Sequence, residues 1–228
     1  MKQADPVTAA SERIADFVAE RILSGHLPPG SRIKQDELAA ELGLSRIPVR
    51  DALRMLEIRG LVSMRANAGA FVTSFGVHDM ETAYKVREKI EPMLLEESMP
   101  YLTEADIEEM RDLLDQMDAT TDVEDYLPLD RAFHWVSYRG NRTLQLTQMV
   151  ERLWDTTQSY RRAYTKLALK NGGRILATEH KLLFGAIERR EIEMAQSTLV
   201  MHIRRTRIGL AQYGYLLEQD PVVRTSTY

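Results

Sequence analysis

The stretch LGLSRIPVRDALRMLEIRG, residues 42–60, carries a proline close to the beginning of an otherwise helical pattern. A proline ring removes a backbone N–H and clashes with the preceding turn, so a helix accepts it readily only in its first turn. Ser45 is a residue type that caps helix N-termini, and a helix beginning at Arg46 places Pro48 at its third position. The proline therefore fixes where this helix starts, and with it the directions of the side chains that follow.

One side of this helix is apolar and is expected to face a core: Val49, Ala52, Leu53 and Leu56. Arg46 and Arg50 lie one turn apart on the neighbouring side, and Ile47 and Arg54 lie further round. A charged face in contact with water is one explanation of this pattern. The other is that the first two turns enter the major groove of DNA, where arginine binds guanine O6 and N7 with two hydrogen bonds.

The surrounding sequence favours DNA. Apolar residues at helical spacing precede the turn SGHLPPG, and QDELAAELG predicts a second compact helix. After Gly60, the pieces 61–64 and 70–73 predict a hairpin around a turn that contains Asn67 and Gly69. Three helices and a hairpin are the order of a winged helix-turn-helix. Positive charge is also focused here, because residues 45–65 hold five arginines against two acidic residues although the whole chain has a net charge of −4.

From about residue 78 the strand signals disappear and long amphipathic helices follow. They are expected at 78–98, 103–119, 122–139, 142–160, 173–190 and 191–215. The predicted fold is therefore mainly α, with two domains. Residues 1–75 would form the winged helix-turn-helix, and residues 76–228 would form an all-helical bundle.

Four polar side chains lie in the middle of apolar stripes in the second domain: Asp130, His134, His180 and His202. A buried carboxylate or imidazole is costly unless it is paired. Each histidine could simply share a hydrogen bond with a carbonyl or hydroxyl group. Alternatively, the four side chains bind one metal ion. Nitrogen and oxygen ligands without sulfur suit Zn²⁺, Ni²⁺ or Mn²⁺, and four protein ligands leave positions open on a six-coordinate ion.

Cysteine content and hydropathy indicate the cellular compartment of the protein. The chain has no cysteine, which excludes disulfides and thiolate metal sites and fits a reducing cytoplasm. It contains no run of about 18 apolar residues, and its N-terminus lacks the apolar core of a signal peptide. We therefore expect a cytoplasmic protein with no membrane span.

The segment GHLPPGSRIKQDELAAELGLSRIPVRDALRMLEIRGLVSMRANAGAFV resembles the DNA-binding domain of the GntR family of bacterial transcription regulators. The likeness covers about residues 8–74 and includes the PG turn, the frame LA..LG.SR.PVR.AL..LE..GLV and the glycine-containing wing. It implies DNA contacts from the recognition helix and the wing: Ser45, Arg46, Ile47, Arg50, Arg54, Asn67 and Gly69. Two positions depart from the pattern, since relatives often carry threonine at Ile47 and arginine at Ala68.

The pieces YKVREKIEP, DRAFHW and EHKLLFGAIERREIEMAQSTLVMHI are similar to the helical C-terminal FCD domain of the FadR-like branch of this family. In its metal-binding members an Asp-x-x-x-His pair and two further histidines hold the ion, and Asp130, His134, His180 and His202 match all four positions. Members of this branch usually sense small organic acids. Arg87 matches an arginine that can face the effector, although an i,i+4 ion pair with Glu91 is the alternative explanation.

Together these features predict a homodimeric repressor that binds a pseudo-palindromic double-stranded DNA operator and responds to a small carboxylate or sugar acid. The rival hypothesis is a metal-dependent hydrolase-type enzyme in which the Asp/His site activates water. Against it, the chain has no HExxH motif, and Glu179 should project about 100° away from His180 on its helix. A third hypothesis is an architectural DNA-binding protein with a purely structural bundle.

Overall fold

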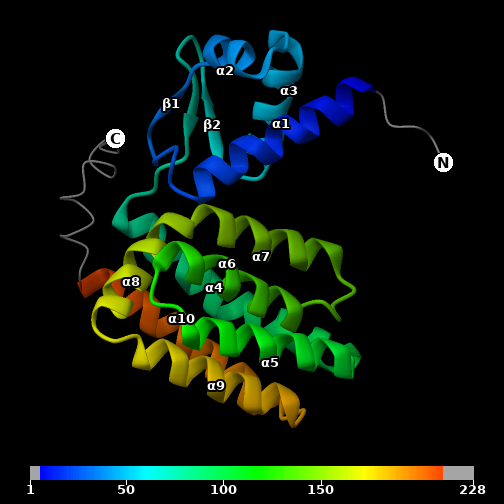
Figure 1. Ribbon diagram of the computed structural model, residues 1–228, viewed down its shortest axis with the longest axis vertical. Coiled ribbons are helices and arrows are strands. Elements are labelled where there is room, and N and C mark those ends of the chain that lie inside the picture. The colour runs from blue at the N-terminus through cyan, green and yellow to red at the C-terminus, as the bar shows by residue number, and fades with distance from the viewer. Residues whose placement is uncertain (1–5, 213–228) are drawn as a thin grey trace. The chain divides into compact units, whose positions relative to one another are not determined.

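Residues 6–212 are described in the computed structural model of the chain (Figure 1). They divide into two compact units. One comprises residues 6–76 together with the short stretch 154–159, and the other comprises 77–153 and 160–212. No helix within the described part is long and apolar enough to cross a membrane.

The first unit contains three helices and a small antiparallel sheet. The helices are α1 (Pro6–Leu23), α2 (Gln35–Leu42) and α3 (Arg46–Ile58). The strands are β1 (Arg32–Ile33), β2 (Val62–Arg65) and β3 (Gly69–Val72), with β3 in the centre of the sheet. The predicted hairpin is therefore confirmed within one residue at each end. β1 was not predicted, because two residues are too short to show an alternating pattern.

The core of this unit explains the direction of α3. Val49, Ala52, Leu53 and Leu56 are fully buried, as the helical spacing predicted, and pack with residues of α1, α2 and the sheet. The preceding helix ends at Gly43, which adopts φ 65°, a conformation that favours glycine. α3 then begins at Arg46 with Pro48 at its third position, as predicted.

From residue 77 to residue 212 the described elements are all helices. In chain order they are α4 (Val77–Ser98), the short 3₁₀ helix η1 (Met99–Tyr101), α5 (Glu104–Ala119), α6 (Val123–Ser137), α7 (Leu144–Thr156), α8 (Gln158–Lys170), α9 (Arg174–Glu188) and α10 (Ile192–Gln212). The stretch 154–159, where α7 ends and α8 begins, groups with the first unit. α4 packs along α10, α5 packs against α6 and α9, and α9 packs against α10 (Figure 1). The mainly α fold with a winged helix-turn-helix is therefore confirmed.

One predicted helix was wrong. The segment predicted as a single helix over 142–160 is divided, because α7 ends at Thr156 and α8 begins at Gln158. The rest of α8 was not predicted at all. Its buried positions include the polar side chains of Gln158, Arg161 and Thr165, so the apolar periodicity that reveals other helices is weak here. The last three residues of the predicted helix 191–215 lie outside the described residues.

Candidate functional site

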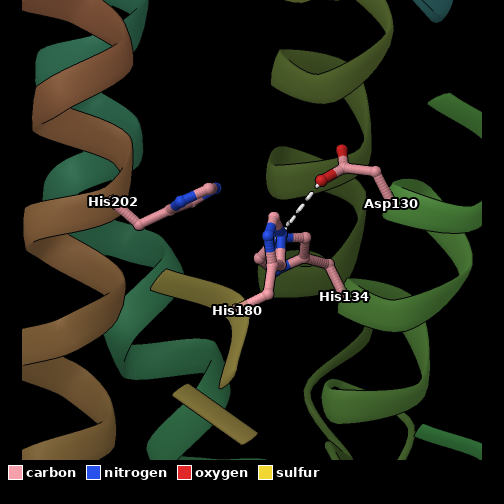
Figure 2. Close-up of side chains that lie close together, drawn as sticks. All are labelled: Asp130, His134, His180 and His202. Carbon is pink, nitrogen blue, oxygen red and sulfur yellow. Dashed lines mark hydrogen bonds and ion pairs between the residues drawn. The ribbon is translucent and has the colours of Figure 1, made fainter. Parts of the chain in front are cut away.

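Three helices of the second unit carry the four candidate metal ligands. Asp122 caps α6 by accepting hydrogen bonds from two backbone N–H groups, and Asp130 and His134 follow one turn apart on that helix. Figure 2 shows the side chains of both reaching inward from α6, His180 approaching from α9 and His202 from α10. Asp130, His134 and His180 are buried, and the His202 side chain is 12% exposed. The structure therefore brings together all four residues that the sequence singled out.

The donor atoms are spaced as ligands of one ion would be. Nε2 of His180 lies 3.1 Å from Oδ1 of Asp130 and 3.3 Å from Nε2 of His134. Nε2 of His134 lies 3.9 Å from the same Asp130 oxygen, and one donor atom from each of the four residues lies within 4.8 Å of all the others. Metal–ligand bonds of about 2.0–2.2 Å separate neighbouring donors by about 3–4 Å. The residues therefore fit a divalent transition-metal ion.

Hydrogen bonds behind two of the rings hold them in place. Nδ1 of His180 is 2.9 Å from the backbone oxygen of Leu176 on the same helix. Because a carbonyl oxygen can only accept, Nδ1 donates and the Nε2 lone pair faces the cluster. Nδ1 of His202 is 3.0 Å from Oε2 of Glu179, a residue of α9. Both arrangements are typical of histidines that bind metals through the other ring nitrogen.

The protonation states favour metal binding as well. Burial alone would raise the pKa of Asp130, but the neighbouring His180, 3.1 Å away, and the nearby positive charge outweigh it and hold the pKa below its ordinary value. Burial lowers the pKa of His134 well below its usual range, against the opposing effect of Asp130. The carboxylate is therefore ionised and the imidazole neutral near pH 7, which are the forms that coordinate metals.

A second set of buried polar side chains, formed by Arg87, Glu91 and Tyr138, joins α4 to the end of α6. Nε of Arg87 lies 2.5 Å from Oε1 of Glu91, and the hydroxyl of Tyr138 donates to Oε2 of Glu91 at 2.9 Å. The guanidinium of Arg87 also lies over the ring of Tyr84, 4.9 Å from its centroid. The i,i+4 ion pair considered from the sequence is therefore present, but it is buried. Burial and the charge of Arg87 lower the pKa of the buried Arg161 to about 9, against the opposing effect of Asp130, so both guanidinium groups influence this part of the bundle.

The residues predicted to contact DNA lie on an exposed face of α3. Ser45 occupies the capping position with extended backbone, but its side chain makes no capping hydrogen bond. Arg46 pairs with Asp36 of α2 at 2.6 Å, with both side chains exposed. Ile47 is 62% exposed and Arg54 is exposed beside Asp51. Arg50 is also exposed, and it has no acidic partner anywhere in residues 6–212.

The wing presents a tight turn between β2 and β3. Asn67 adopts φ 60° and is exposed, and Gly69 adopts φ 96° at the first position of β3. Positive φ is rare for residues with a side chain other than asparagine and aspartate, so both residue types suit this turn. On β2, the guanidinium of Arg65 lies 4.4 Å from the ring centroid of Phe71 on β3. α3 and the wing thus offer one helix and one turn of the kind that bind the two DNA grooves.

Sequence reasoning missed the residues that surround the candidate ligands. From the sequence, Glu179 was considered only by its direction relative to His180, its neighbour along the chain. In the structure it is hydrogen-bonded to His202, which lies on another helix. Tyr138 was not considered, although it bonds to Glu91. Each contact joins two helices, and helical periodicity gives the direction of a side chain but not the neighbour it meets.

Two family models match the chain. Residues 10–72 match "Bacterial regulatory proteins, gntR family", and residues 82–205, more than half of the chain, match the "FCD domain". The chain belongs to the GntR family and carries an FCD domain. The family assignment makes this protein a ligand-responsive DNA-binding transcriptional regulator, and the matched families do not favour the enzyme hypothesis.

Relatives of this GntR-family protein are regulators too. It is 28% identical over 188 residues to the uncharacterized HTH-type transcriptional regulator YdhC of Bacillus subtilis, covering 79% of this chain and 82% of that protein. It is 29% identical to the regulator McbR of Escherichia coli over 62% of this chain and 66% of that one. The solved structure of E. coli McbR/YncC has the same fold, with a TM-score of 0.79 and 22% identity over 90% of this chain and 98% of that chain.

Proposed function

We propose that this regulator is a repressor whose FCD domain binds a divalent transition metal and a small organic acid. Asp130, His134, His180 and His202 would hold the metal, which would be Zn²⁺, Ni²⁺ or Mn²⁺. The observation that carries the proposal is the convergence of four donor groups from three helices within 4.8 Å of one another. Metal content of the purified protein, with and without the His180→Ala substitution, tests this part of the proposal.

The effector would be an anion. Four protein ligands leave open positions on a six-coordinate ion, and a bound metal supplies a Lewis acid that attracts a carboxylate. Two buried arginines in the same domain add positive charge near these ligands. The charge of Arg161 acts on Asp130, and the charge of Arg87 acts on His134. A small carboxylate or sugar acid therefore fits the site, with Arg87 as a further contact.

The DNA would be read by residues 1–75, and effector binding would take place in residues 76–228. α3 would enter the major groove with Ser45, Arg46, Ile47, Arg50 and Arg54, and the wing would contact the minor groove with Asn67 and Gly69. The protein would act in the cytoplasm as a homodimer. Each protomer would place one DNA-binding unit on one half of a pseudo-palindromic operator.

Effector binding would weaken DNA binding. A ligand can shift this equilibrium only as far as its affinity differs between DNA-competent and DNA-incompetent arrangements. Relief of repression therefore requires that the acid binds more tightly to the DNA-incompetent arrangement. An electrophoretic mobility shift assay with metal-loaded protein, operator DNA and a panel of small acids tests this, and tighter DNA binding with the effector would contradict it.

A further inference from the structure

Glu179 is a buried carboxylate behind the candidate metal centre. It lies on α9 next to His180 in sequence and is 2% exposed. Its Oε2 atom lies 3.0 Å from Nδ1 of His202, which comes from α10. A carboxylate from one helix therefore holds a candidate ligand that belongs to another.

This contact determines which nitrogen of His202 faces the other ligands. An ionised carboxylate can only accept a hydrogen bond, so Nδ1 of His202 must carry a proton. In the neutral ring, Nε2 then keeps the lone pair that a metal needs. His180 is held in the same way by the backbone oxygen of Leu176, at 2.9 Å. The two histidines thus share one tautomer, with the proton on Nδ1, but are held in it by different acceptors.

We propose that Glu179 is a positioning residue of the metal centre, holding His202 in the tautomer and orientation that bind the ion. This inference rests on the proposed metal binding by Asp130 and the three histidines. Unlike the backbone acceptor behind His180, Glu179 is a side chain that substitution can remove. Carboxylates that accept from metal-bound histidines increase the affinity of the site, and their loss typically weakens binding by about 10- to 100-fold.

Arg205 fixes the carboxylate in turn. Its Nε donates to Oε1 of Glu179, so each oxygen of Glu179 has its own donor on α10. The Arg205 side chain is 43% exposed, whereas that of Glu179 is 3% exposed. Arg205 also lines an open cavity of about 480 Å³ between α8, α9 and α10, together with Arg174 and Tyr164. The contacts therefore run from a solvent-accessible arginine through a buried carboxylate to a metal ligand.

The test measures the Zn²⁺ affinity of the metal-free full-length protein by competition with a chromophoric chelator. Glu179→Leu should weaken binding by about 10- to 100-fold. Glu179→Gln keeps a carbonyl acceptor and should lose less, and Arg205→Ala should also lose less than the leucine variant. Arg204→Ala is the matched control, because Arg204 is 52% exposed on the same helix but pairs with Glu88. It should bind Zn²⁺ like the wild type.

Two further measurements separate positioning from a general structural role. In a His202→Ala background, Glu179→Leu should cause no additional loss of Zn²⁺ affinity, since its effect acts through His202. The histidine ¹H–¹⁵N spectrum of the metal-free wild type should show His202 protonated at Nδ1, and Glu179→Leu should shift this tautomer because it removes the acceptor. Thermal unfolding of each metal-free variant checks that it folds, and the glutamine variant serves if the leucine variant does not.

Equal Zn²⁺ affinity of the wild type and a folded Glu179→Leu protein would overturn the inference, as would a loss that persists in the His202→Ala background. Absence of Zn²⁺ binding by the wild type would instead contradict the proposed metal site. In that case the tautomer spectrum still decides whether Glu179 positions His202, and a wild-type His202 protonated only at Nε2 would refute the inference.

Discussion

Nε2 of His180 lies 3.1 Å from Oδ1 of Asp130, although the two residues come from different helices, α9 and α6. The pair places a nitrogen donor and an oxygen donor at the separation expected around one metal ion. His134 and His202 complete the group. This relationship gives the helical domain a group of side chains suited to binding a metal ion.

Removal of one ligand should abolish tight metal binding without unfolding the DNA-binding unit. His134→Ala should lower the Zn²⁺ content of the purified protein, because it takes away one of four donors. Elemental analysis measures the content, and circular dichroism checks the fold. His78→Ala is the control, since His78 is exposed and stands outside the cluster. Unchanged metal content in the His134→Ala protein would show that the site is assigned to the wrong residues.

Arg50→Ala should reduce sequence discrimination. If Arg50 reads a base, its loss should cost about 1–3 kcal/mol of discrimination at one base pair of the operator. Fluorescence anisotropy with a set of single-base operator variants measures this. Lys170→Ala removes an equal charge at the end of α8, outside the residues proposed to contact DNA, and should leave discrimination intact. A uniform loss across all sequences would mean that Arg50 contacts phosphate instead.

Removal of one partner of the buried ion pair between Arg87 and Glu91 should destabilise the fold. Glu91→Leu leaves the buried guanidinium without its carboxylate and should lower the free energy of unfolding by about 3–5 kcal/mol. The double substitution Arg87→Met/Glu91→Leu removes both charges and should lose less. Chemical denaturation of the metal-free proteins measures both. A double variant less stable than Glu91→Leu would contradict this explanation.

Acid should weaken the packing of α4 against α10 through Glu88. Burial alone would raise the pKa of Glu88, but its hydrogen bonds to Arg207 and Arg204 lower the pKa below the ordinary value. A carboxyl group with a lowered pKa in the folded state stabilises the fold above its unfolded pKa of about 4.3, and this contribution is lost as pH falls through the folded pKa. Glu88→Gln should therefore show a smaller fall in melting temperature than the wild type below about pH 4.3. Equal acid sensitivity would contradict this role.

Helical periodicity predicted the elements whose inward face is marked by apolar residues. The recognition helix is the best case, because Pro48 fixes its start and Val49, Ala52, Leu53 and Leu56 fix its inward face. The four candidate ligands were predicted for the same reason, since each interrupts an apolar stripe. Their mutual distances could not be predicted, because they depend on how α6, α9 and α10 pack.

The failures have a common physical cause. α8 buries Arg161 and Thr165, so its inward face does not look apolar in the sequence. Glu179 and Tyr138 have partners on other helices, and a single chain pattern carries no signal for such contacts. Buried polar groups in this protein are therefore visible in the sequence where apolar residues frame them. They are missed where the inward face of the helix is itself partly polar, as in α8.

The most direct test of the account is a fluorescence anisotropy titration of Zn²⁺-loaded protein bound to its operator with small monocarboxylates, dicarboxylates and sugar acids. At least one acid should lower the operator affinity of the wild type and have no effect on the His180→Ala protein. An acid that released both proteins equally would contradict the central claim, because the effector would then act without the metal centre.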